Sequence, residues 1–339
     1  MRLLQAMGGA RHGGAEEFFL RLAAALHRAG QDQLVLLRHG AHAERLRAAG
    51  VAVRELPFGG LLDFATASGF RNAIAAYRPD IVLTWMSRAS RLCPRGDFVH
   101  VARLGGYYDL RHYRNCDHLV GNTRDLVAHF LAKGWPAARA HYLPNFVDAA
   151  AVAPVARSSL ATPDDAPLAL ALGRLHPNKA FDVLIAALAQ VPHLHLWLAG
   201  TGDERGALER QAAATGVSER IRFLGWRQDV PALLAAADFL VCPSRHEPLG
   251  NVVIEAWAAR RPVVAAASAG PAELIRNEET GLLVPVDDVE ALAAAMRSLA
   301  EDAALRRRLG DAGHAAYEAE FTEAQVVAAY RGFLAAVAR

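Results

Sequence analysis

The stretch ADFLVCPSRHEPLGNVVIEAW, from Ala237 to Trp257, indicates the fold class of this chain. It begins with the apolar run FLVC, continues through a polar loop and ends in a helical pattern. Short apolar strands of this kind are typical of parallel sheets that are covered by helices on both faces. Because ligands bind at the carboxyl ends of such strands, the loop that carries Glu247 is predicted to line a binding site.

The loop places one carboxylate on each side of a Pro-Leu-Gly turn, with Glu247 before the turn and Glu255 in the helix that we expect over about 250–259. The first backbone N–H groups of a helix have no partner within the helix, and the helix dipole favours negative charge there. The pattern therefore has two interpretations. The amides and carboxylates bind a phosphate and sugar hydroxyls, or the two glutamates only stabilise the helix N-terminus.

Short apolar runs alternate with helical patterns along the whole chain. A representative helical pattern is 14–30, in which apolar residues recur every four positions. We predict strands at 2–7, 33–38, 80–85, 98–103 and 117–121, and then at 167–175, 193–202, 220–226, 237–244, 262–268 and 281–285. This order predicts an α/β protein with two Rossmann-like, doubly wound domains that face each other across a cleft.

The length of 339 residues favours two domains over one. The stretch 148–167 is rich in Ala, Pro, Ser and Asp and has no clear period, which makes it the best linker candidate. We predict an N-terminal domain over 1–155, a C-terminal domain over 156–320 and a terminal helix over 321–339 that packs back toward the N-terminal domain.

Charge is divided unevenly between the two halves. Residues 1–150 hold 19 basic and 12 acidic residues, a balance of +7, whereas residues 151–339 hold 18 and 23, a balance of −5. This indicates either an uneven surface or an anionic partner, such as a membrane surface or an acidic acceptor. No apolar run reaches the roughly 20 residues that span a bilayer, and the first residues do not resemble a signal peptide. We therefore expect a cytoplasmic protein whose three cysteines are reduced.

The segment GRLHPNKAFDVLIAAL, from Gly173 to Leu188, repeats the order of strand, polar turn and helix. Of the 37 basic residues in the chain only Lys133 and Lys179 are lysines, and Lys179 lies in this turn. A compact ammonium and the nearby guanidinium of Arg174 are suited to neutralise a diphosphate. Together with the glutamate loop, this turn predicts a pocket for a sugar nucleotide.

Other patterns in the chain are weaker. AGTGDERG, at 199–206, is similar to a dinucleotide-binding glycine pattern, but its spacing is one residue too long and no acidic residue ends the next strand. No Asp-x-Asp sequence is present, and His193 and His195 are interpreted as structural residues. We expect no metal, no cofactor and no nucleic-acid partner.

The motifs of the second half resemble those of one enzyme group in order and spacing. The segments GRLHPNKAFDVLIAAL, LWLAGTGDERGALE, IRFLGWRQDVPALLAAADFLVCPSRHEPLGNVVIEAWAARRPVVA and AGPAELIRNEETGLLVPVDD are similar to successive motifs of retaining GT-B-fold glycosyltransferases of the group 1, family 4 type. The resemblance covers nearly all of residues 167–339. In the first half, Gly13 and Gly14 are similar to the glycine loop of the group, and NTRDLVAHFLAKGWP and HYLPNFVD, which includes Asp148, to its closing segment.

The resemblance implies a role for each matching residue. Arg174 and Lys179 would hold the leaving diphosphate, Glu247 would bind hydroxyls of the donor sugar, and Glu255 would bind the ribose. The remaining donor-binding positions implied are Gly13, Gly14, Gly173, Gly225, Trp226, Leu249, Gly250 and Asn251. Glu247→Ala would then abolish transfer with nucleoside diphosphate binding nearly intact, whereas Glu255→Ala would weaken nucleotide binding.

The acceptor side departs from the group. Many of its members carry a histidine near the end of the strand at 98–103, where this chain has Gly105 and Gly106. The segment GGYYDLRHYRN that follows interleaves tyrosines with basic residues, a mixture that suits an anionic glycan. The acceptor residues expected in it are Tyr107, Tyr108, Arg111 and Arg114. An alternative is that these tyrosines pack the domain and the arginines are solvated.

The resemblance implies a metal-independent, retaining hexosyltransferase that uses a nucleotide-diphosphate sugar, with a UDP-sugar favoured. We expect a glycan or glycolipid acceptor from lipopolysaccharide core or surface polysaccharide synthesis, and peripheral contact with the inner face of the cytoplasmic membrane. Two alternatives differ in class: a sugar-nucleotide epimerase of the same fold, and a sugar-nucleotide binder without catalysis. Incubation with donor alone distinguishes the first, and a comparison of turnover with binding distinguishes the second.

Overall fold

The computed structural model describes residues 1–9, 14–59, 63–147 and 152–338, and Gly13 and Asp148 lie outside the described residues. The chain forms two compact units. The first unit comprises Met1–Phe146 and Glu323–Arg339, and the second comprises Val147–Thr322.

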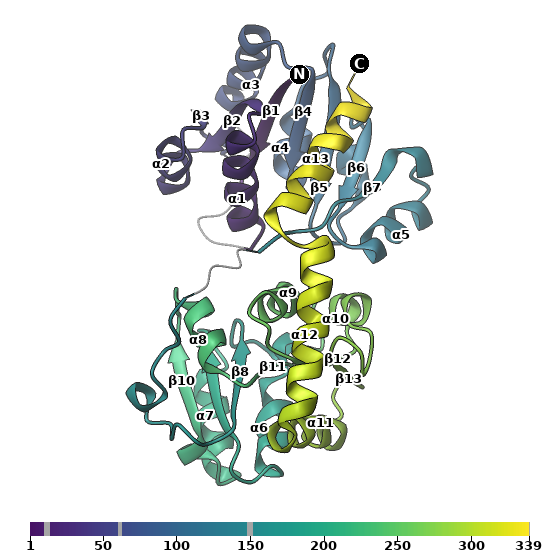
Figure 1. Cartoon of the computed structure of the whole chain (residues 1–339). Helices are drawn as coiled ribbons and strands as arrows, with labels where there is room; N and C mark the ends of the chain where they lie inside the picture. The colour runs from purple at the N-terminus through teal and green to yellow at the C-terminus, as the bar shows by residue number, and fades with distance from the viewer. Residues whose placement is uncertain (10–13, 60–62, 148–151, 339) are drawn as a thin grey trace. The chain divides into compact units, whose positions relative to one another are not determined.

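The first unit is built on a seven-stranded parallel sheet in the order β3-β2-β1-β4-β5-β6-β7. Its strands are β1 (Arg2–Met7), β2 (Asp32–Arg38), β3 (Ala52–Leu56), β4 (Ile81–Trp85), β5 (Val99–Leu104), β6 (His118–Gly121) and β7 (Ala140–Tyr142). Its α-helices are α1 (Gly14–Arg28), α2 (Ala41–Ala48), α3 (Phe64–Tyr77), α4 (Met86–Leu92), α5 (Arg124–Ala132) and α13 (Glu323–Val337). Figure 1 shows α1 and α13 on the same face of this sheet, and their apolar residues share one core cluster.

The second unit contains a six-stranded parallel sheet in the order β10-β9-β8-β11-β12-β13. Its strands are β8 (Leu168–Leu172), β9 (His195–Ala199), β10 (Ile221–Gly225), β11 (Phe239–Cys242), β12 (Val263–Ala266) and β13 (Leu282–Val284). Its α-helices are α6 (Phe181–Ala189), α7 (Arg205–Ala214), α8 (Val230–Ala236), α9 (Asn251–Ala258), α10 (Ala269–Leu274), α11 (Val289–Glu301) and α12 (Ala303–Glu320). Residues of α6, α7 and α11 cover one face of the sheet, and residues of α8, α9 and α12 cover the other.

The strand order reverses once in each sheet, between β1 and β4 in the first and between β8 and β11 in the second. At such a switch point the two connecting segments leave toward opposite faces of the sheet, and the crevice left outside the carboxyl ends is where α/β proteins bind ligands. In the second unit the segments that leave this point are those after β8 and after β11. They are the turn that carries Arg174 and Lys179 and the loop that carries Glu247, both of which the sequence analysis predicted to bind ligand.

The predicted strands are confirmed, but the sequence analysis missed β3 and β7. Both lie at the edges of the first sheet. An edge strand has a neighbour on one side only, so it is more exposed and carries more polar residues. Exposed and partly buried residues alternate along most of β3, and all three residues of β7 are partly buried. The continuous apolar pattern used to find the other strands is therefore absent from these two.

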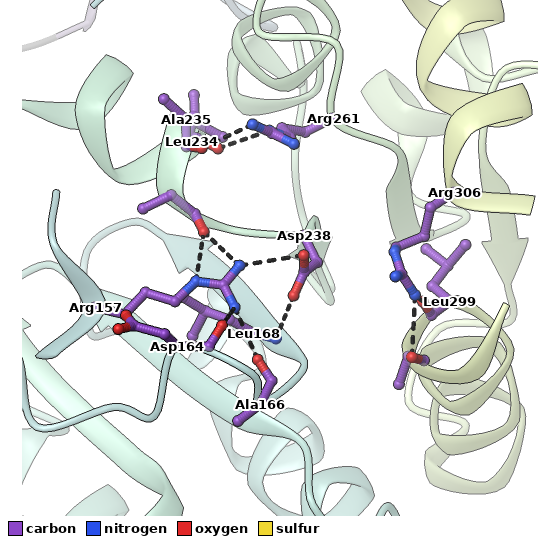
Figure 2. Close-up of polar contacts among 12 residues, drawn as sticks. Arg157, Asp164, Ala166, Leu168, Leu234, Ala235, Asp238, Arg261, Leu299 and Arg306 are labelled. Atoms are coloured by element: carbon purple, nitrogen blue, oxygen red, sulfur yellow. Dashed lines mark hydrogen bonds and ion pairs between the residues drawn. The ribbon is translucent and has the colours of Figure 1, made fainter. Parts of the chain in front are cut away.

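The linker expected over 148–167 was wrong for its described part, because residues 152–166 are bound to the second unit. The Arg157 guanidinium donates to the carbonyl oxygens of Ala166 (2.8 Å) and Ala236 (2.7 Å) and contacts the Asp238 carboxylate at 3.2 Å, as Figure 2 shows. Val155 N–H also donates to the carbonyl of Ala232. The units consequently divide at Val147, before the boundary expected at 155.

Arginines fix several helix ends of the second unit in this way. Arg261 donates to the carbonyls of Leu234 and Ala235 in the last turn of α8, and Arg306 donates to those of Leu299 and Ala300 near the end of α11. The last carbonyls of a helix have no partner within it, and each of these guanidinium groups donates to two of them.

The C-terminal helix α13 belongs to the first unit. Arg28 at the end of α1 donates to both carboxylate oxygens of Glu323 at the start of α13, at 2.6 and 2.7 Å. Val326, Tyr330 and Leu334 are buried in the core that α13 shares with α1. The terminal helix predicted over 321–339 therefore packs on the sheet of the N-terminal unit.

A buried histidine in the first unit leads to a prediction about pH. His100 on β5 is 3% exposed, and its ring contacts Thr84 Oγ1 at 2.9 Å and the carbonyl of Asn115 at 3.2 Å. Burial lowers the pKa of His100 to about 4. In the unfolded chain the same ring has a pKa of about 6.5. Between these values the unfolded state binds a proton that the folded state does not, so stability is lost as the pH falls from about 6.5 toward 4.

We expect the His100 contribution to lower the free energy of unfolding by about 3 kcal/mol at pH 4 relative to pH 7. Urea unfolding followed at several pH values measures this loss. His100→Gln should flatten the dependence on pH below 6.5, whereas the same change at the exposed His112 should leave it unaltered. An unchanged slope in the His100 variant would contradict the assignment.

Candidate functional site

The candidate site lies at the switch point of the second sheet, where an ion pair joins the two segments that leave β8 and β11. The Nζ of Lys179, in the turn after β8, donates to Oε2 of Glu247, in the loop after β11. The side chains are 22% and 13% exposed, so the pair is partly shielded from water but open to a ligand. The structure thus brings together two residues that the sequence placed in separate motifs.

The turn that carries Lys179 depends on glycine and on unusual backbone angles. Gly173 follows β8 with a φ of 150°, and a Cβ at this position would lie 3.1 Å from Lys179 Cε. The absence of a side chain at 173 therefore leaves room for the lysine chain to cross the backbone. A short 3-10 turn over Pro177–Lys179 follows, and Ala180 has a φ of 51° where α6 begins.

Glycines also allow three neighbouring strand ends to approach closely. Gly200 N–H donates to the carbonyl of Gly225 at 2.8 Å, and a Cβ on Gly200 would lie 1.7 Å from the Gly173 carbonyl oxygen. A Cβ on Gly202 would lie 2.2 Å from the carbonyl oxygen of Leu175. Gly200 and Gly202 of the AGTGDERG segment therefore allow the loops to pack closely against one another.

The glutamate loop is fixed by its contact with the start of α10. Gly270 N–H donates to the carbonyl of Glu247 at 2.7 Å, and a Cβ on Gly270 would lie 2.5 Å from the carbonyl carbon of Leu249. Gly250 has a φ of 75° and directly precedes α9, which begins at Asn251. The loop thus turns through a left-handed residue and leads into the amino end of α9, as the sequence predicted.

The remaining donor-side residues surround this point. Glu255 lies on α9 four positions after Asn251, so the two residues share one face of the helix, and both are partly buried. Arg174 is exposed and makes no hydrogen bond or ion pair within the described ranges. Gly225, with a φ of 68°, precedes Trp226, whose side chain is 73% exposed at the end of β10. An exposed indole of this size at a strand end is available to stack on a planar ring.

The first unit carries the other predicted site residues. Gly14 is exposed at the first position of α1. Tyr107 is 43% exposed, its hydroxyl donates to Asp125, and its ring packs edge-on against His129. Tyr108 is partly buried, and burial raises its pKa.

The two arginines expected to bind the acceptor are both exposed. Arg111 Nε donates to Asp109 Oδ2 at 2.7 Å, and this guanidinium holds the pKa of Asp109 at about 2. Tyr113 of the same segment is completely buried in the core, so for this residue the alternative that the tyrosines pack the domain is correct. A tyrosine that ends a short 3-10 turn cannot be assigned to the surface or the core from sequence alone.

The sequence analysis did not find one residue that is central to the site. Arg245, two positions before Glu247, contacts two other segments, through Pro177 and Asp182 after β8 and through Asp287 after β13. No local pattern links these positions to Arg245. The one available signal was an arginine inside the same loop as a predicted ligand-binding glutamate.

The residues that the structure describes include no group of three or more histidine, cysteine, aspartate or glutamate side chains arranged to hold a metal ion. Cys93, Cys116 and Cys242 are buried and form no disulfide, as expected. A search of the same residues found no helix with the length and apolar character of a membrane span.

Two doubly wound parallel sheets, with a lysine and a glutamate paired at the switch point of the second, define a glycosyltransferase of the GT-B fold. Comparison with known families agrees. The model for "Glycosyl transferases group 1" matches residues 166–302, and the model for "Glycosyltransferase Family 4" matches residues 12–151. The chain belongs to this glycosyltransferase family, which confirms the resemblance seen in its motifs.

Similar proteins match over nearly the whole length. The lipopolysaccharide core biosynthesis glycosyltransferase LpsE of Rhizobium meliloti is 38% identical over 330 residues, covering 96% of both chains. LpsD of the same organism is 36% identical and covers 94% of both. Among solved structures, Anabaena Alr3699/HepE in complex with UDP superposes with a TM-score of 0.87 at 23% identity, over 99% of this chain and 100% of that one. The structural likeness confirms the fold.

Proposed function

We propose that this glycosyltransferase transfers a hexose from a UDP-sugar to a growing lipopolysaccharide core, with retention of configuration and without a metal ion. The observation that carries the donor assignment is the Lys179–Glu247 pair at the switch point, because it places a cation for a diphosphate beside a carboxylate for sugar hydroxyls. The names of the two Rhizobium relatives support the acceptor class, and the UDP bound by the Anabaena protein supports the donor class.

In the proposed reaction the acceptor hydroxyl oxygen forms a bond to the anomeric carbon while the bond from that carbon to the diphosphate oxygen breaks. The acceptor proton passes to the departing phosphate. Lys179 and Arg174 stabilise the negative charge that develops on the diphosphate. Glu247 orients the sugar through its hydroxyls, Glu255 binds the ribose, and Trp226 lies beside the base. The proposed place of this reaction is the inner face of the cytoplasmic membrane.

Transfer is expected to proceed in excess chelator. Guanidinium and ammonium groups take over the compensation of diphosphate charge that a divalent cation supplies in other transferases. The test incubates a series of sugar nucleotides with lipopolysaccharide core acceptors in the presence of EDTA and identifies products by mass spectrometry. Loss of activity that Mg²⁺ or Mn²⁺ restores would exclude the metal-independent mechanism.

The same product tests the other parts of the proposal. An α-configured donor should give an α-linked product, which the anomeric coupling constant in the NMR spectrum reports. Incubation with donor alone should release no epimerised sugar. Interconversion of sugar nucleotides without an acceptor would favour the epimerase alternative, and tight donor binding without any turnover would favour the binder.

The acceptor assignment rests on the segment after β5, where Arg111 and Arg114 are exposed beside Tyr107. Replacing both arginines with alanine is expected to raise the acceptor KM about tenfold or more, since each charge-assisted contact to an anionic group contributes about 1.5–3 kcal/mol. Donor affinity should stay at the wild-type value, because neither arginine is among the residues assigned to the donor. Steady-state kinetics with varied acceptor measures the effect. A double variant with normal acceptor KM would contradict the assignment.

A further inference from the structure

Arg245 connects the three loops around the proposed donor site. Its Nη1 donates to the carbonyl of Pro177 at 2.7 Å and to Asp182 Oδ1 at 2.9 Å, and its Nη2 contacts Asp182 Oδ2 at 2.6 Å. Its Nε contacts Asp287 Oδ1 at 2.6 Å. Pro177 and Asp182 follow β8, Arg245 follows β11, and Asp287 follows β13. One side chain therefore joins the carboxyl ends of three strands.

These contacts bind the two halves of the lysine–glutamate pair to each other. Pro177 precedes Lys179 by two positions, and Arg245 precedes Glu247 by two positions. Between them, His246 N–H donates to the carbonyl of Asn178 at 3.2 Å. The loops are thus held together by two successive contacts directly beside the ion pair. A shift of either loop would change the distance between the ammonium and the carboxylate.

The geometry also shows that Arg245 is not itself a free phosphate ligand. A guanidinium has five N–H donors. Four of them are directed at Pro177, at the two oxygens of Asp182 and at Asp287. Two carboxylates surround the single positive charge. Because its donors and its charge are engaged in these contacts, Arg245 is suited to position its neighbours. Lys179 is the residue assigned to bind the diphosphate.

We propose that Arg245 is a positioning residue that holds the Lys179 turn and the Glu247 loop at the separation that donor binding and transfer require. This inference rests on the proposed function, since it assigns Lys179 to the diphosphate. We expect that a lysine cannot replace Arg245, because a single ammonium lacks the planar fork that contacts Asp182, Pro177 and Asp287 together.

The test measures kcat, KM for the donor and UDP affinity by calorimetry in Arg245→Ala and Arg245→Lys. Both variants are expected to lose about 10–100-fold in kcat/KM, since displacement of reacting groups by about 1 Å costs about 100-fold. Both should also bind UDP more weakly. Asp182→Asn keeps the guanidinium and removes one charged partner, so it should also lose activity, but by a smaller factor. This variant provides the test if the Arg245 variants do not fold.

The matched control is Arg157→Ala. Arg157 is another arginine of the second unit with several carbonyl partners and an aspartate, but it lies at the amino ends of β8 and β11, away from the proposed site. Its loss is expected to lower the melting temperature while the folded fraction keeps the wild-type UDP affinity and donor KM. If Arg245→Ala behaves like Arg157→Ala, with reduced stability and unchanged kinetics, the positioning role is wrong.

A double-mutant cycle separates this inference from the proposed function. In a Lys179→Ala background, Arg245→Ala should cause a smaller further loss of transfer than it does in the wild type, because one of the two groups that it positions is gone. Full additivity of the two losses would overturn the positioning role and leave the donor assignment intact. Wild-type transfer by Lys179→Ala would instead overturn the donor assignment first.

Discussion

Lys179→Ala is expected to lower kcat/KM by about 10²–10³-fold, because a preorganised donor to a developing oxyanion contributes about 2.7–4 kcal/mol to transition-state stabilisation. In the structure the ammonium already lies at the carboxyl ends of the β-strands, paired with Glu247 and partly shielded from water. Shielding strengthens its interaction with a diphosphate relative to an exposed lysine. Transfer of radiolabelled sugar from donor to acceptor, measured at subsaturating donor, gives the ratio directly.

The chain provides its own control for this variant. Lys133 is the other lysine of the protein and is exposed at the C-terminal cap of α5 in the first unit. Lys133→Ala removes the same charge and should keep kcat/KM within about twofold, since surface substitutions away from a site have small effects. A Lys179→Ala enzyme within threefold of wild type would rule out the diphosphate role.

Glu247→Gln is expected to abolish measurable transfer and, at the same time, to bind UDP about five to ten times more tightly. The glutamine amide cannot accept hydrogen bonds from sugar hydroxyls as a carboxylate does, so orientation of the sugar is lost. The gain in UDP affinity has a different cause. Glu247 pairs with the Lys179 ammonium, and its negative charge opposes a diphosphate. A five- to tenfold gain in UDP affinity on removal of this carboxylate charge corresponds to about 1–1.4 kcal/mol of binding free energy.

Calorimetry with UDP and with an intact, unreactive UDP-sugar analogue measures both effects. UDP should gain affinity in Glu247→Gln, whereas the analogue should gain less because it loses its contacts to the carboxylate. The gain should vanish in Lys179→Ala/Glu247→Gln, where no cation remains to be released. Glu255→Gln is the contrasting variant, since it should weaken UDP binding. Unchanged UDP affinity in Glu247→Gln would show that the ion pair does not oppose the nucleotide.

The Lys179–Glu247 ion pair adds an effect that the expectation from the sequence did not include. The motif alone assigns Glu247 to the sugar and implies that nucleoside diphosphate binding is nearly independent of it. The Lys179–Glu247 contact joins residues 68 positions apart. No periodicity or local motif predicts which carboxylate will pair with Lys179, because the pairing depends on how the loops after two strands pack together.

Local patterns were sufficient for the strands that lie inside the sheets. The residues of β4, β8 and β11 are buried throughout, so each appears in the sequence as a continuous apolar run. The same reasoning failed for the edge strands β3 and β7, which consist almost entirely of exposed and partly buried residues, although it found the other two edge strands, β10 and β13. It also could not place Tyr113, which is completely buried in a cluster with residues of β5, β6 and α5.

By itself the sequence determined the α/β class, the interior strands and the identity of the two loops that form the site, because burial periodicity and strand-end motifs are local properties of the chain. Only the tertiary structure decided that Lys179 faces Glu247, that Arg245 joins the ends of β8, β11 and β13, and that residues 152–166 are bound to the second unit through Arg157. Each of these contacts joins a guanidinium or ammonium to an oxygen that is distant in the sequence. The strand order decides which segments lie close enough to make such contacts, so they are a property of the folded sheet.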